Sequence, residues 1–334
     1  MQCKRNGLLP SDFPRRARTL LARVHVPLTL HCRQPAAIMS PVTAPNLALS
    51  PIVAGAWRMA DWGWTAEQRV RWIEQCMELG VTSFDHADIY GGYQVEALFG
   101  EALALKPMLR QHMQLVGKCG IKLVGEARPE HRVKHYDTSP AHITRSVENS
   151  LRALQTDHLD LLLIHRPDAL MEADDVAEAF TALRQAGKVR AFGVSNFTPA
   201  QFELLNSRIA LATNQIELHP LHLSPLHDGT LDQCQRLRLR PMIWSPLAGG
   251  KLLTGSDERS RRVQAALQAV GQRHGVSAAT VAYAWLLRHP TRPHPLTGSQ
   301  RLEAIREALA ALQLKLDAES WTEIWQAGSG HEVA

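Results

Sequence analysis

The chain has 334 residues, of which 45% are hydrophobic and 21% are charged, a composition typical of a globular protein. Its formal net charge is +5, but residues 1–39 hold seven Lys and Arg residues against one acid, Asp12, which leaves a net charge of −1 for the rest. This near-neutral remainder argues against nucleic-acid binding, and no apolar run approaches the roughly 18 residues of a membrane helix. Five scattered cysteines without a Cys-x-x-Cys pair indicate a reducing compartment, so we expect a cytoplasmic protein.

Residues 1–44 are predicted to be a basic, disordered extension, and residues 45–330 a single barrel domain. The basic segment has two interpretations. Targeting peptides are basic and poor in acids, whereas an upstream extension with Met39 as the natural start would have no folded role. If the segment bound nucleic acid, trimming the chain to Met39 would abolish its retention on a polyanion column.

Beyond Leu49, short apolar runs alternate with stretches of helical periodicity. Thr65 is the predicted N-cap of the first helix, and the polar stretch 119–139 is predicted to be a loop. Eight runs are predicted to be strands: 52–55, 81–84, 113–118, 159–165, 189–195, 212–217, 240–245 and 293–297. The predicted helices cover 66–79, 94–106, 140–154, 176–186, 199–206, 231–237, 259–274, 278–289, 301–312 and 316–326.

The order of these elements predicts the fold. Strands alternate with helices and none has a hairpin partner in sequence, which indicates a parallel sheet. Eight units favour closure into a barrel over an open doubly wound sheet. A Rossmann fold would need Gly-x-Gly-x-x-Gly after the first strand, and that motif is absent. We therefore predict an α/β protein with one (β/α)8 TIM barrel.

Polar or aromatic side chains end six consecutive predicted strands. In a barrel of this type the carboxyl ends of the strands carry the active site, so these side chains are candidates for chemistry. They are Asp85 and Tyr90 after the second strand, Lys118 after the third, His165 after the fourth, Ser195 and Asn196 after the fifth, Gln215 after the sixth, and Trp244 and Ser245 after the seventh.

Four of these residues suggest proton donation to a carbonyl oxygen. The phenol of Tyr90 has an ordinary pKa of about 10, and a neighbouring ammonium from Lys118 is expected to lower it. Asp85 would hold Lys118 charged and in place, and His165 would direct a second hydrogen bond to the same substrate oxygen. Because none of them is an obvious nucleophile, the attacking group should be a hydride from a cofactor.

With these residues in view, the chain from about Leu49 to near its C-terminus resembles the aldo-keto reductases. The closer resemblance is to a bacterial branch of oxidoreductases with the motifs Asp-His-Ala-Asp-Ile-Tyr-Gly-Gly-Tyr and His-Arg-Pro-Asp. It implies a barrel enzyme that reduces the carbonyl group of a small aldehyde or ketone with NAD(P)H. Neither nucleic acid nor a membrane is expected as a partner, and members of the family are usually monomers. The stretches that carry it are 84–91, 116–118, 161–168, 193–197, 214–215 and 244–247.

The resemblance also implies residue roles. Tyr90 would be the general acid, tuned by Lys118 and Asp85, with His165 orienting the carbonyl. The cofactor would be bound by Ser195, Asn196, Gln215, Trp244, Ser245, Leu247, Gly249, Gly298, Ser299, Arg301 and Glu307. The substrate pocket would be walled by Trp57, Trp62 and Trp64, for which ordinary packing is the alternative.

One segment departs from the family pattern. After the eighth strand the family usually has basic residues for the 2′-phosphate of NADPH and then Glu-Asn for the adenine. Here Ala304 stands where the usual Arg would fall, and Ala308 replaces the Asn after Glu307. Arg301 or Arg306 could substitute as the cation. NADPH remains the expected cofactor, with NADH possible.

Two other functions remain alternatives. A metal-dependent barrel hydrolase could use His86, Asp88 and His165 as ligands, but that class needs His-x-His on the first strand, and no strand here has it. Added divalent metal restoring activity to a chelated sample would support it. A regulatory module that holds the cofactor and turns over slowly is the second alternative, and co-purification with a stoichiometric partner would support it.

Overall fold

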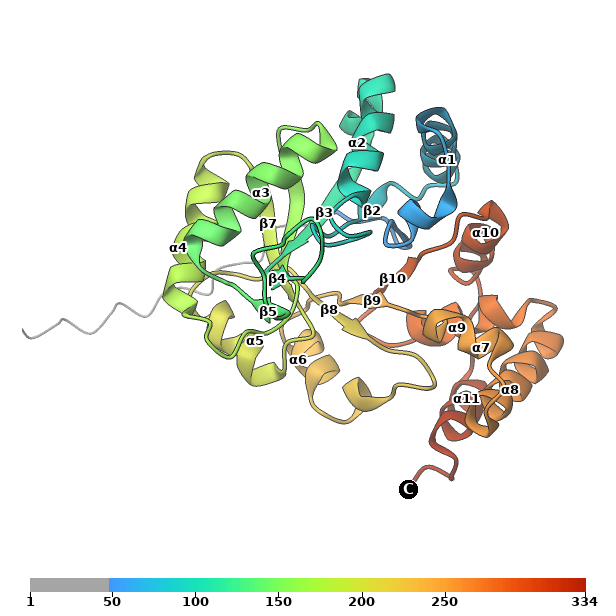
Figure 1. The fold of residues 1–334 in the computed structure, drawn as a ribbon. Helices are drawn as coiled ribbons and strands as arrows, with labels where there is room; N and C mark the ends of the chain where they lie inside the picture. Colours follow the sequence, from blue (N-terminus) through green and yellow to red (C-terminus); the bar gives the residue numbers. More distant parts are fainter. Residues whose placement is uncertain (1–47) are drawn as a thin grey trace, which may run out of the picture. The chain divides into compact units, whose positions relative to one another are not determined.

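The computed structural model describes residues 48–334, and the basic extension predicted over 1–44 lies outside these residues. Eight parallel strands form a closed barrel in the order β1-β10-β9-β8-β7-β6-β3-β2, surrounded by helices (Figure 1). The TIM barrel predicted from the sequence is therefore confirmed. The barrel strands are β1 Val53–Gly55, β2 Ser83–Asp85, β3 Gln114–Cys119, β6 Leu159–Ile164, β7 Val189–Ser195, β8 Asn214–Glu217, β9 Met242–Trp244 and β10 His294–Thr297.

The helices follow the predicted order, and Thr65 caps the first one as expected: its side chain accepts from the backbone N–H of Gln68. The short helix α7 was not predicted, because four residues are too few to show a helical period. The helices are α1 Ala66–Glu78, α2 Val95–Leu105, α3 Pro140–Leu154, α4 Ala173–Gln185, α5 Pro199–Asn206, α6 Thr230–Arg236, α7 Lys251–Thr254, α8 Glu258–His274, α9 Ala278–Leu287, α10 Leu302–Ala310 and α11 Ala318–Ser329. No helix of residues 48–334 is both long and apolar enough to cross a membrane.

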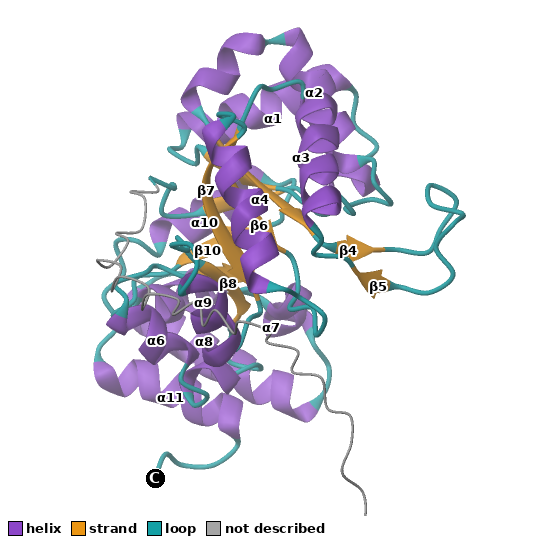
Figure 2. Cartoon of the chain, turned by 90° about the vertical axis from the view of Figure 1, so that its left-hand side faces the viewer, coloured by secondary structure: helices purple, strands orange, loops and turns teal. Residues whose placement is uncertain are grey.

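The stretch 119–139 was predicted to be a loop, but it also contains two short strands. It contains an antiparallel pair, β4 Ile121–Lys122 and β5 His135–Tyr136, which projects from the barrel (Figure 2). Each strand has only two residues, so neither shows an alternating pattern that the sequence could reveal. The expectation that no strand has a hairpin partner therefore holds for the barrel strands but is wrong for this pair.

Alternation along the strands sorts side chains between two cores. In β6, Leu161 and Leu163 belong to a small cluster inside the barrel, while Leu162 and Ile164 pack in the larger core that includes the helices. In β3, Val116 is in the inner cluster, so Lys118, two residues further on, points to the same side. The apolar filling thus stops below the C-terminal end, where polar side chains follow.

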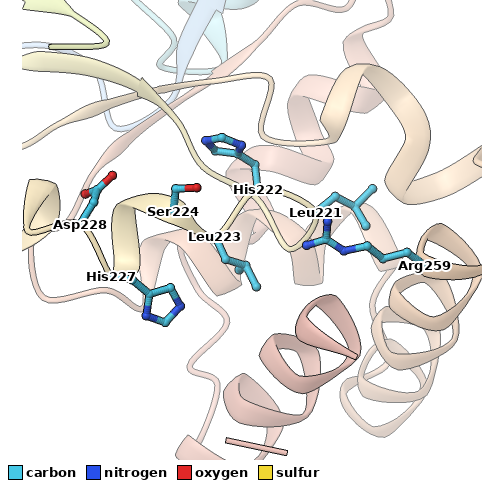
Figure 3. Close-up of a pocket in the computed structure, with 7 residues that line it drawn as sticks. All are labelled: Leu221, His222, Leu223, Ser224, His227, Asp228 and Arg259. Atoms are coloured by element: carbon cyan, nitrogen blue, oxygen red, sulfur yellow. The ribbon is translucent and has the colours of Figure 1, made fainter. Parts of the chain in front are cut away.

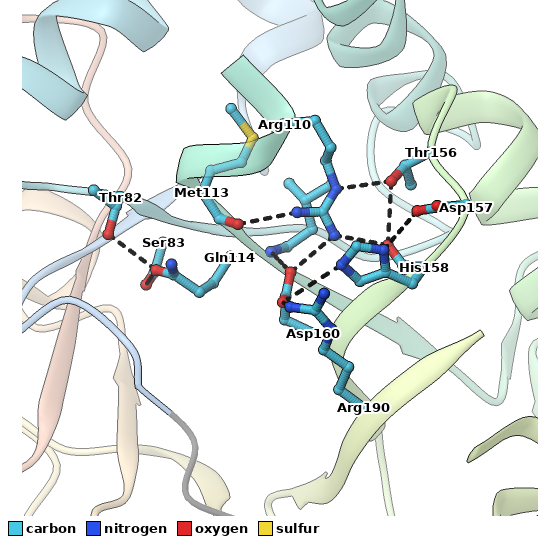
Figure 4. Close-up of polar contacts among 11 residues, drawn as sticks. Thr82, Ser83, Arg110, Met113, Gln114, Thr156, Asp157, His158, Asp160 and Arg190 are labelled. Carbon is cyan, nitrogen blue, oxygen red and sulfur yellow. Dashed lines mark hydrogen bonds and ion pairs between the residues drawn. The ribbon is translucent and has the colours of Figure 1, made fainter. Parts of the chain in front are cut away.

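The opposite end of the barrel is held by the buried carboxylate of Asp160, near the start of β6 (Figure 4). Its Oδ2 accepts from the Arg110 guanidinium and from the Leu115 backbone N–H, both at 2.9 Å, and its Oδ1 accepts from Arg190 at 2.9 Å. Arg110 also donates to the His158 carbonyl at 2.9 Å. This network ties β3, β6 and β7 to the segment before β3.

Two further carboxyl groups are buried beside α2 and α3. Asp88 Oδ2 accepts from Ser146 of α3 at 2.8 Å, while Asp88 Oδ1 and Glu96 Oε1 have no hydrogen-bond partner within residues 48–334. Burial raises the pKa of Asp88 to about 7. Burial and the charge of Asp88 raise the pKa of Glu96 to about 8. Both acids therefore keep their protons to higher pH in the folded protein than in the unfolded chain.

We expect Asp160→Asn to lower the free energy of unfolding by about 3 kcal/mol, because it leaves the guanidinium of Arg110 buried without a counter-charge. Arg190→Gln is the matched control: the Arg190 side chain is 65% exposed, so its loss should cost less than about 1 kcal/mol. Urea unfolding followed by circular dichroism measures both. Equal losses in the two variants would contradict this account.

The buried acids predict a pH dependence of stability. In the unfolded chain both acids lose their protons near pH 4. Above that pH the folded state therefore binds more protons than the unfolded state. The free energy of unfolding falls as pH rises toward the folded pKa values of about 7 and about 8. Buried His86, with a pKa of about 3, acts in the opposite direction only below about pH 6.5. Between about pH 6.5 and about pH 8, wild type should therefore lose more stability than Asp88→Asn/Glu96→Gln, by at most about 1.4 kcal/mol per pH unit for each acid. Parallel stability curves would refute the assignment.

Candidate active site

The site is organised around the ammonium of Lys118, which is 1% exposed. Its Nζ donates to three oxygens: Asp85 Oδ2 at 2.6 Å, the His86 carbonyl at 2.8 Å and the Tyr90 hydroxyl at 2.9 Å. An ammonium has three N–H groups, so this set of acceptors satisfies it completely. The structure thus brings together Asp85, Lys118 and Tyr90, as the sequence analysis expected.

The barrel strands and one turn create this arrangement. Asp85 ends β2, Lys118 lies in β3, and the two strands are neighbours in register. Lys118 Nζ lies 4.8 Å from the Tyr90 ring centroid, and the chain turns directly after Tyr90 at Gly91 and Gly92, whose φ values of 56° and 65° residues other than glycine rarely adopt. At Gly91 a Cβ would also lie 2.9 Å from Ala60 Cβ and from Val95 Cγ2.

His165 follows β6 and completes the group. Its backbone N–H donates to the Cys119 carbonyl at 2.8 Å, and its ring centroid lies 5.9 Å from that of Tyr90 in an edge arrangement. Burial, with the nearby charges of Lys118 and Arg166, lowers the pKa of His165 well below its ordinary value. The imidazole is therefore neutral near pH 7.

Burial and mutual charge effects together set the pKa values of Lys118 and Tyr90. Burial opposes the charge on Lys118, but Asp85 and Tyr90 outweigh it and raise the pKa of the ammonium. Burial also raises the pKa of Tyr90, and the opposing effect of Lys118 does not reverse it. Lys118 lowers the pKa of Tyr90, as expected, but desolvation of the phenolate outweighs this effect, so the net pKa of Tyr90 lies above its ordinary value.

The predicted cofactor residues at the next strand ends contact one another. Trp244 Nε1 donates to Asn196 Oδ1 at 3.0 Å, Asn196 Nδ2 donates to Ser195 Oγ at 3.2 Å, and Ser195 Oγ donates to the Gln215 carbonyl at 2.9 Å. Gln215 Nε2 donates to Asp85 Oδ1 at 2.7 Å. A continuous hydrogen-bonded row therefore joins the ends of β7, β8 and β9 to the acid that holds Lys118.

The loop after β9 contains several left-handed residues, and the backbone N–H groups of Ala248 and Gly250 donate to the carbonyls of Ser245 and Leu247. Ser245, Ala248, Gly249 and Gly250 all have positive φ, with values of 50°, 53°, 65° and 105°. A Cβ added at Gly249 or Gly250 would meet nothing within 4 Å, so this backbone faces open space. Ser245 and Gly249 were predicted here together with Leu247, whereas the conformations of Ala248 and Gly250 could not be foreseen, because a left-handed Ala has no sequence signature.

Of the predicted residues after β10, Gly298, Ser299 and Arg301 precede α10, and Glu307 lies within it. Ser299 Oγ accepts from the Arg301 backbone N–H at 3.1 Å, and α10 begins at Leu302 without a side-chain cap. Arg301 is exposed, and Glu307 is half-buried with its backbone carbonyl accepting from Thr280 at 3.1 Å. Gly298 follows the strand directly, with only the Gly55 carbonyl oxygen within 4.0 Å of an added Cβ.

The three tryptophans assigned to the pocket divide into two kinds. Trp57 is 58% exposed, with the Arg58 guanidinium 5.2 Å from its ring. Trp62 and Trp64 pack against each other, with centroids 4.7 Å apart, and against Trp72 of α1. Packing thus accounts for much of the surface of Trp62 and Trp64, and a substrate role for the three remains a prediction.

The ligands of the alternative metal site are kept apart. The His86 ring packs against Phe99, with centroids 4.5 Å apart, and burial lowers its pKa to about 3. The Asp88 carboxylate is bound by Ser146. Within residues 48–334 no three His, Cys, Asp or Glu side chains come close enough to hold a metal ion.

A surface hollow of about 520 Å³ lies apart from these residues, between the segment after β8 and the start of α8 (Figure 3). None of the side chains that line it was a predicted site residue. They are Leu221, His222, Leu223, Ser224, His227, Asp228 and Arg259.

Comparison with known proteins places the chain in a family. The Aldo/keto reductase family matches residues 51–328. Oxidoreductase YdhF of Escherichia coli is 53% identical over 286 residues, which cover 85% of this chain and 95% of that protein. A 6-dehydroglucose reductase of Agrobacterium fabrum is 47% identical, covering 86% of this chain and 97% of that protein.

Solved structures agree. A glycerol dehydrogenase of Gluconobacter oxydans superposes with a TM-score of 0.75 at 26% identity, covering 85% of this chain and 92% of the other. An aldo/keto reductase of Klebsiella pneumoniae in complex with NADP and acetate superposes with a TM-score of 0.68 at 28% identity, covering 83% and 90%. The chain belongs to the aldo/keto reductase family, as its motifs around Tyr90 and His165 had indicated.

Proposed function

We propose that this oxidoreductase reduces an aldehyde or ketone to an alcohol with NADPH, and that Tyr90 is the proton donor. One observation carries the proposal: a fully buried ammonium, Lys118 Nζ, contacts both the Tyr90 hydroxyl at 2.9 Å and the Asp85 carboxylate at 2.6 Å. A buried cation on a phenol stabilises the phenolate that remains after the proton leaves. This arrangement suits protonation of a developing alkoxide.

Each of the four residues would have its own role in the reaction. The Tyr90 hydroxyl donates its proton to the carbonyl oxygen, and Lys118 stabilises the phenolate that forms. Asp85 keeps Lys118 charged, and the neutral imidazole of His165 offers a second hydrogen bond to the same oxygen. The nicotinamide cofactor, when bound, supplies the hydride.

Tyr90, Lys118, Asp85 and His165 form the proposed catalytic tetrad. The residues around this tetrad fit such a cofactor. Ser195, Asn196 and Gln215 present a hydroxyl and two amides at neighbouring strand ends, suited to a carboxamide. Trp244 offers a ring for stacking. The left-handed loop around Gly249 faces open space, which lets a pyrophosphate approach its backbone closely. A phosphate-binding site formed by the loops after the last two strands is common in barrels of this fold.

The 2′-phosphate of NADPH needs a cation, and Ala304 cannot supply it. Arg306 is engaged by Glu303 at 3.4 Å, whereas Arg301 forms no ion pair among residues 48–334 and stands at the start of α10. A helix N-terminus adds favourable potential for a phosphate. We assign Arg301 as the residue that selects NADPH over NADH.

The substrate is a small carbonyl compound, as the family implies. Two relatives are named 6-dehydroglucose reductase, at 47% and 39% identity. A sugar-derived aldehyde is therefore the first physiological candidate to assay, beside a reactive aromatic aldehyde as a general probe.

Replacing Tyr90 by Phe should lower kcat by about two to four orders of magnitude, because the proton donor is removed. The dissociation constant of NADPH should change less than about twofold, since the phenol does not carry cofactor binding. Initial rates of NADPH oxidation and fluorescence titration measure the two quantities. Tyr93→Phe is the matched control, because the Tyr93 hydroxyl accepts from the Leu123 N–H at 2.9 Å, outside the tetrad.

A Tyr90→Phe variant with near wild-type turnover would show that the tetrad is misassigned. Tight NADPH binding by wild type without turnover, across several aldehydes, ketones and quinones, would favour a cofactor-binding regulatory module instead.

Arg301→Gln should weaken NADPH binding about tenfold and leave NADH binding within about twofold, because only the 2′-phosphate loses its cation. Arg306→Gln, with its side chain paired to Glu303, serves as the control and should change neither cofactor much. The dissociation constants of NADPH and NADH for each variant measure this selectivity. Equal weakening of NADPH and NADH in Arg301→Gln would exclude the selective role.

A further inference from the structure

Arg166 directly follows His165 in the His-Arg-Pro-Asp motif and has no role in the function proposed above. Its guanidinium is held by one nitrogen: Nη1 donates to the His165 carbonyl at 2.7 Å and to Ser195 Oγ at 3.3 Å. Its Cζ lies 5.7 Å from the centroid of the Trp244 ring. The cation is therefore fixed between the tetrad and the row of predicted cofactor residues.

This cation has no carboxylate within ion-pair distance in the part of the chain that the structure describes. Arg166 forms no ion pair there, and its Nε and Nη2 donate to no protein atom. The nearest strand-end acid, Glu217, accepts instead from His219 Nε2 at 3.0 Å. The side chain is half-buried, and burial lowers the pKa of Arg166 while Tyr90 and Glu217 act against this.

The nitrogens of Arg166 that no protein atom accepts from remain available to an anionic ligand. The unused edge of the guanidinium consists of Nε–H and one Nη2–H, which lie parallel and match the two oxygens of a carboxylate. Because Nη1 is anchored to the backbone of His165, this edge is held at a fixed place relative to the imidazole that would orient the carbonyl.

We propose that Arg166 is a specificity-determining residue that binds a carboxylate on the substrate, so that the preferred substrates are aldehydes or ketones carrying an acid group. The inference rests on the proposed function, since it places the reacting carbonyl at Tyr90 and His165. The carboxylate takes the Nε–Nη2 edge while the carbonyl oxygen accepts from the tetrad.

The test compares a charged substrate with a neutral one of similar shape. Rates of NADPH oxidation are measured with 4-carboxybenzaldehyde and with methyl 4-formylbenzoate, and the 2- and 3-carboxy isomers vary the distance between the two groups. In wild type, kcat/KM for the best acid should exceed that for its ester at least tenfold. In Arg166→Gln this ratio should fall to about one.

Two variants control the result. Arg166→Lys keeps the charge but loses the parallel pair of donors, so an intermediate ratio is expected. Arg128→Gln removes an arginine that stacks on Tyr93, 4.4 Å from its ring centroid, and should keep the wild-type ratio. A wild-type ratio near one for every isomer, or a high ratio that survives in Arg166→Gln, would overturn the proposal.

Binding separates this inference from the proposed function. Calorimetric titration of the wild-type protein saturated with NADP⁺ with 4-carboxybenzyl alcohol should show binding at least tenfold tighter than in Arg166→Gln, whether or not the protein turns over. Equal binding by the two proteins would refute the proposal. If instead Arg166→Gln weakens NADPH tenfold and both aldehydes lose rate equally, Arg166 binds the cofactor and the proposal is wrong.

Discussion

The ammonium of Lys118 is the group on which the rest of the site depends. A charge that is 1% exposed is tolerated only when every N–H is bonded and a counter-charge is close, and Asp85, Tyr90 and the His86 carbonyl supply both conditions. Each of these acceptors is itself held by the barrel. Asp85 is fixed by strand register and by Gln215, while the two left-handed glycines set the path of the chain that carries Tyr90.

This interaction also links the proposed chemistry to the proposed cofactor site. Gln215 touches Asp85 with its amide, and its backbone carbonyl accepts from Ser195, which in turn accepts from Asn196. A substitution among the cofactor residues would thus alter the hydrogen bonding of Asp85, the acid that neutralises Lys118. Short strands of three to seven residues are sufficient for this, because their ends meet at one rim and differ little in height.

The two ends of the barrel use buried charge differently. At the N-terminal end, Asp160 is saturated by two guanidinium groups and a backbone N–H, and no open volume is needed. At the C-terminal end, Lys118 is also fully bonded, whereas Arg166 keeps an unused edge and the loop around Gly249 faces open space. The donors of Arg166 that no protein atom accepts are the ones available to a ligand.

The sequence by itself determined the barrel, its element order and the strand ends that bring Asp85, Lys118 and Tyr90 together, because each depends on local patterns: apolar runs, helical periods, and polar residues at strand ends. The antiparallel pair in 119–139 escaped prediction, since two-residue strands carry no periodic pattern. The net pKa of Tyr90 also escaped it, because the sequence shows that Lys118 is present but not how far burial outweighs its charge. Only the tertiary structure decided that Arg306 is paired while Arg301 is not, and that Arg166 lies between His165 and Trp244. The Arg306–Glu303 pair is local to α10, but the contacts of Arg166 with Ser195 and Trp244 join residues distant in sequence, and their geometry is set by packing across the closed barrel.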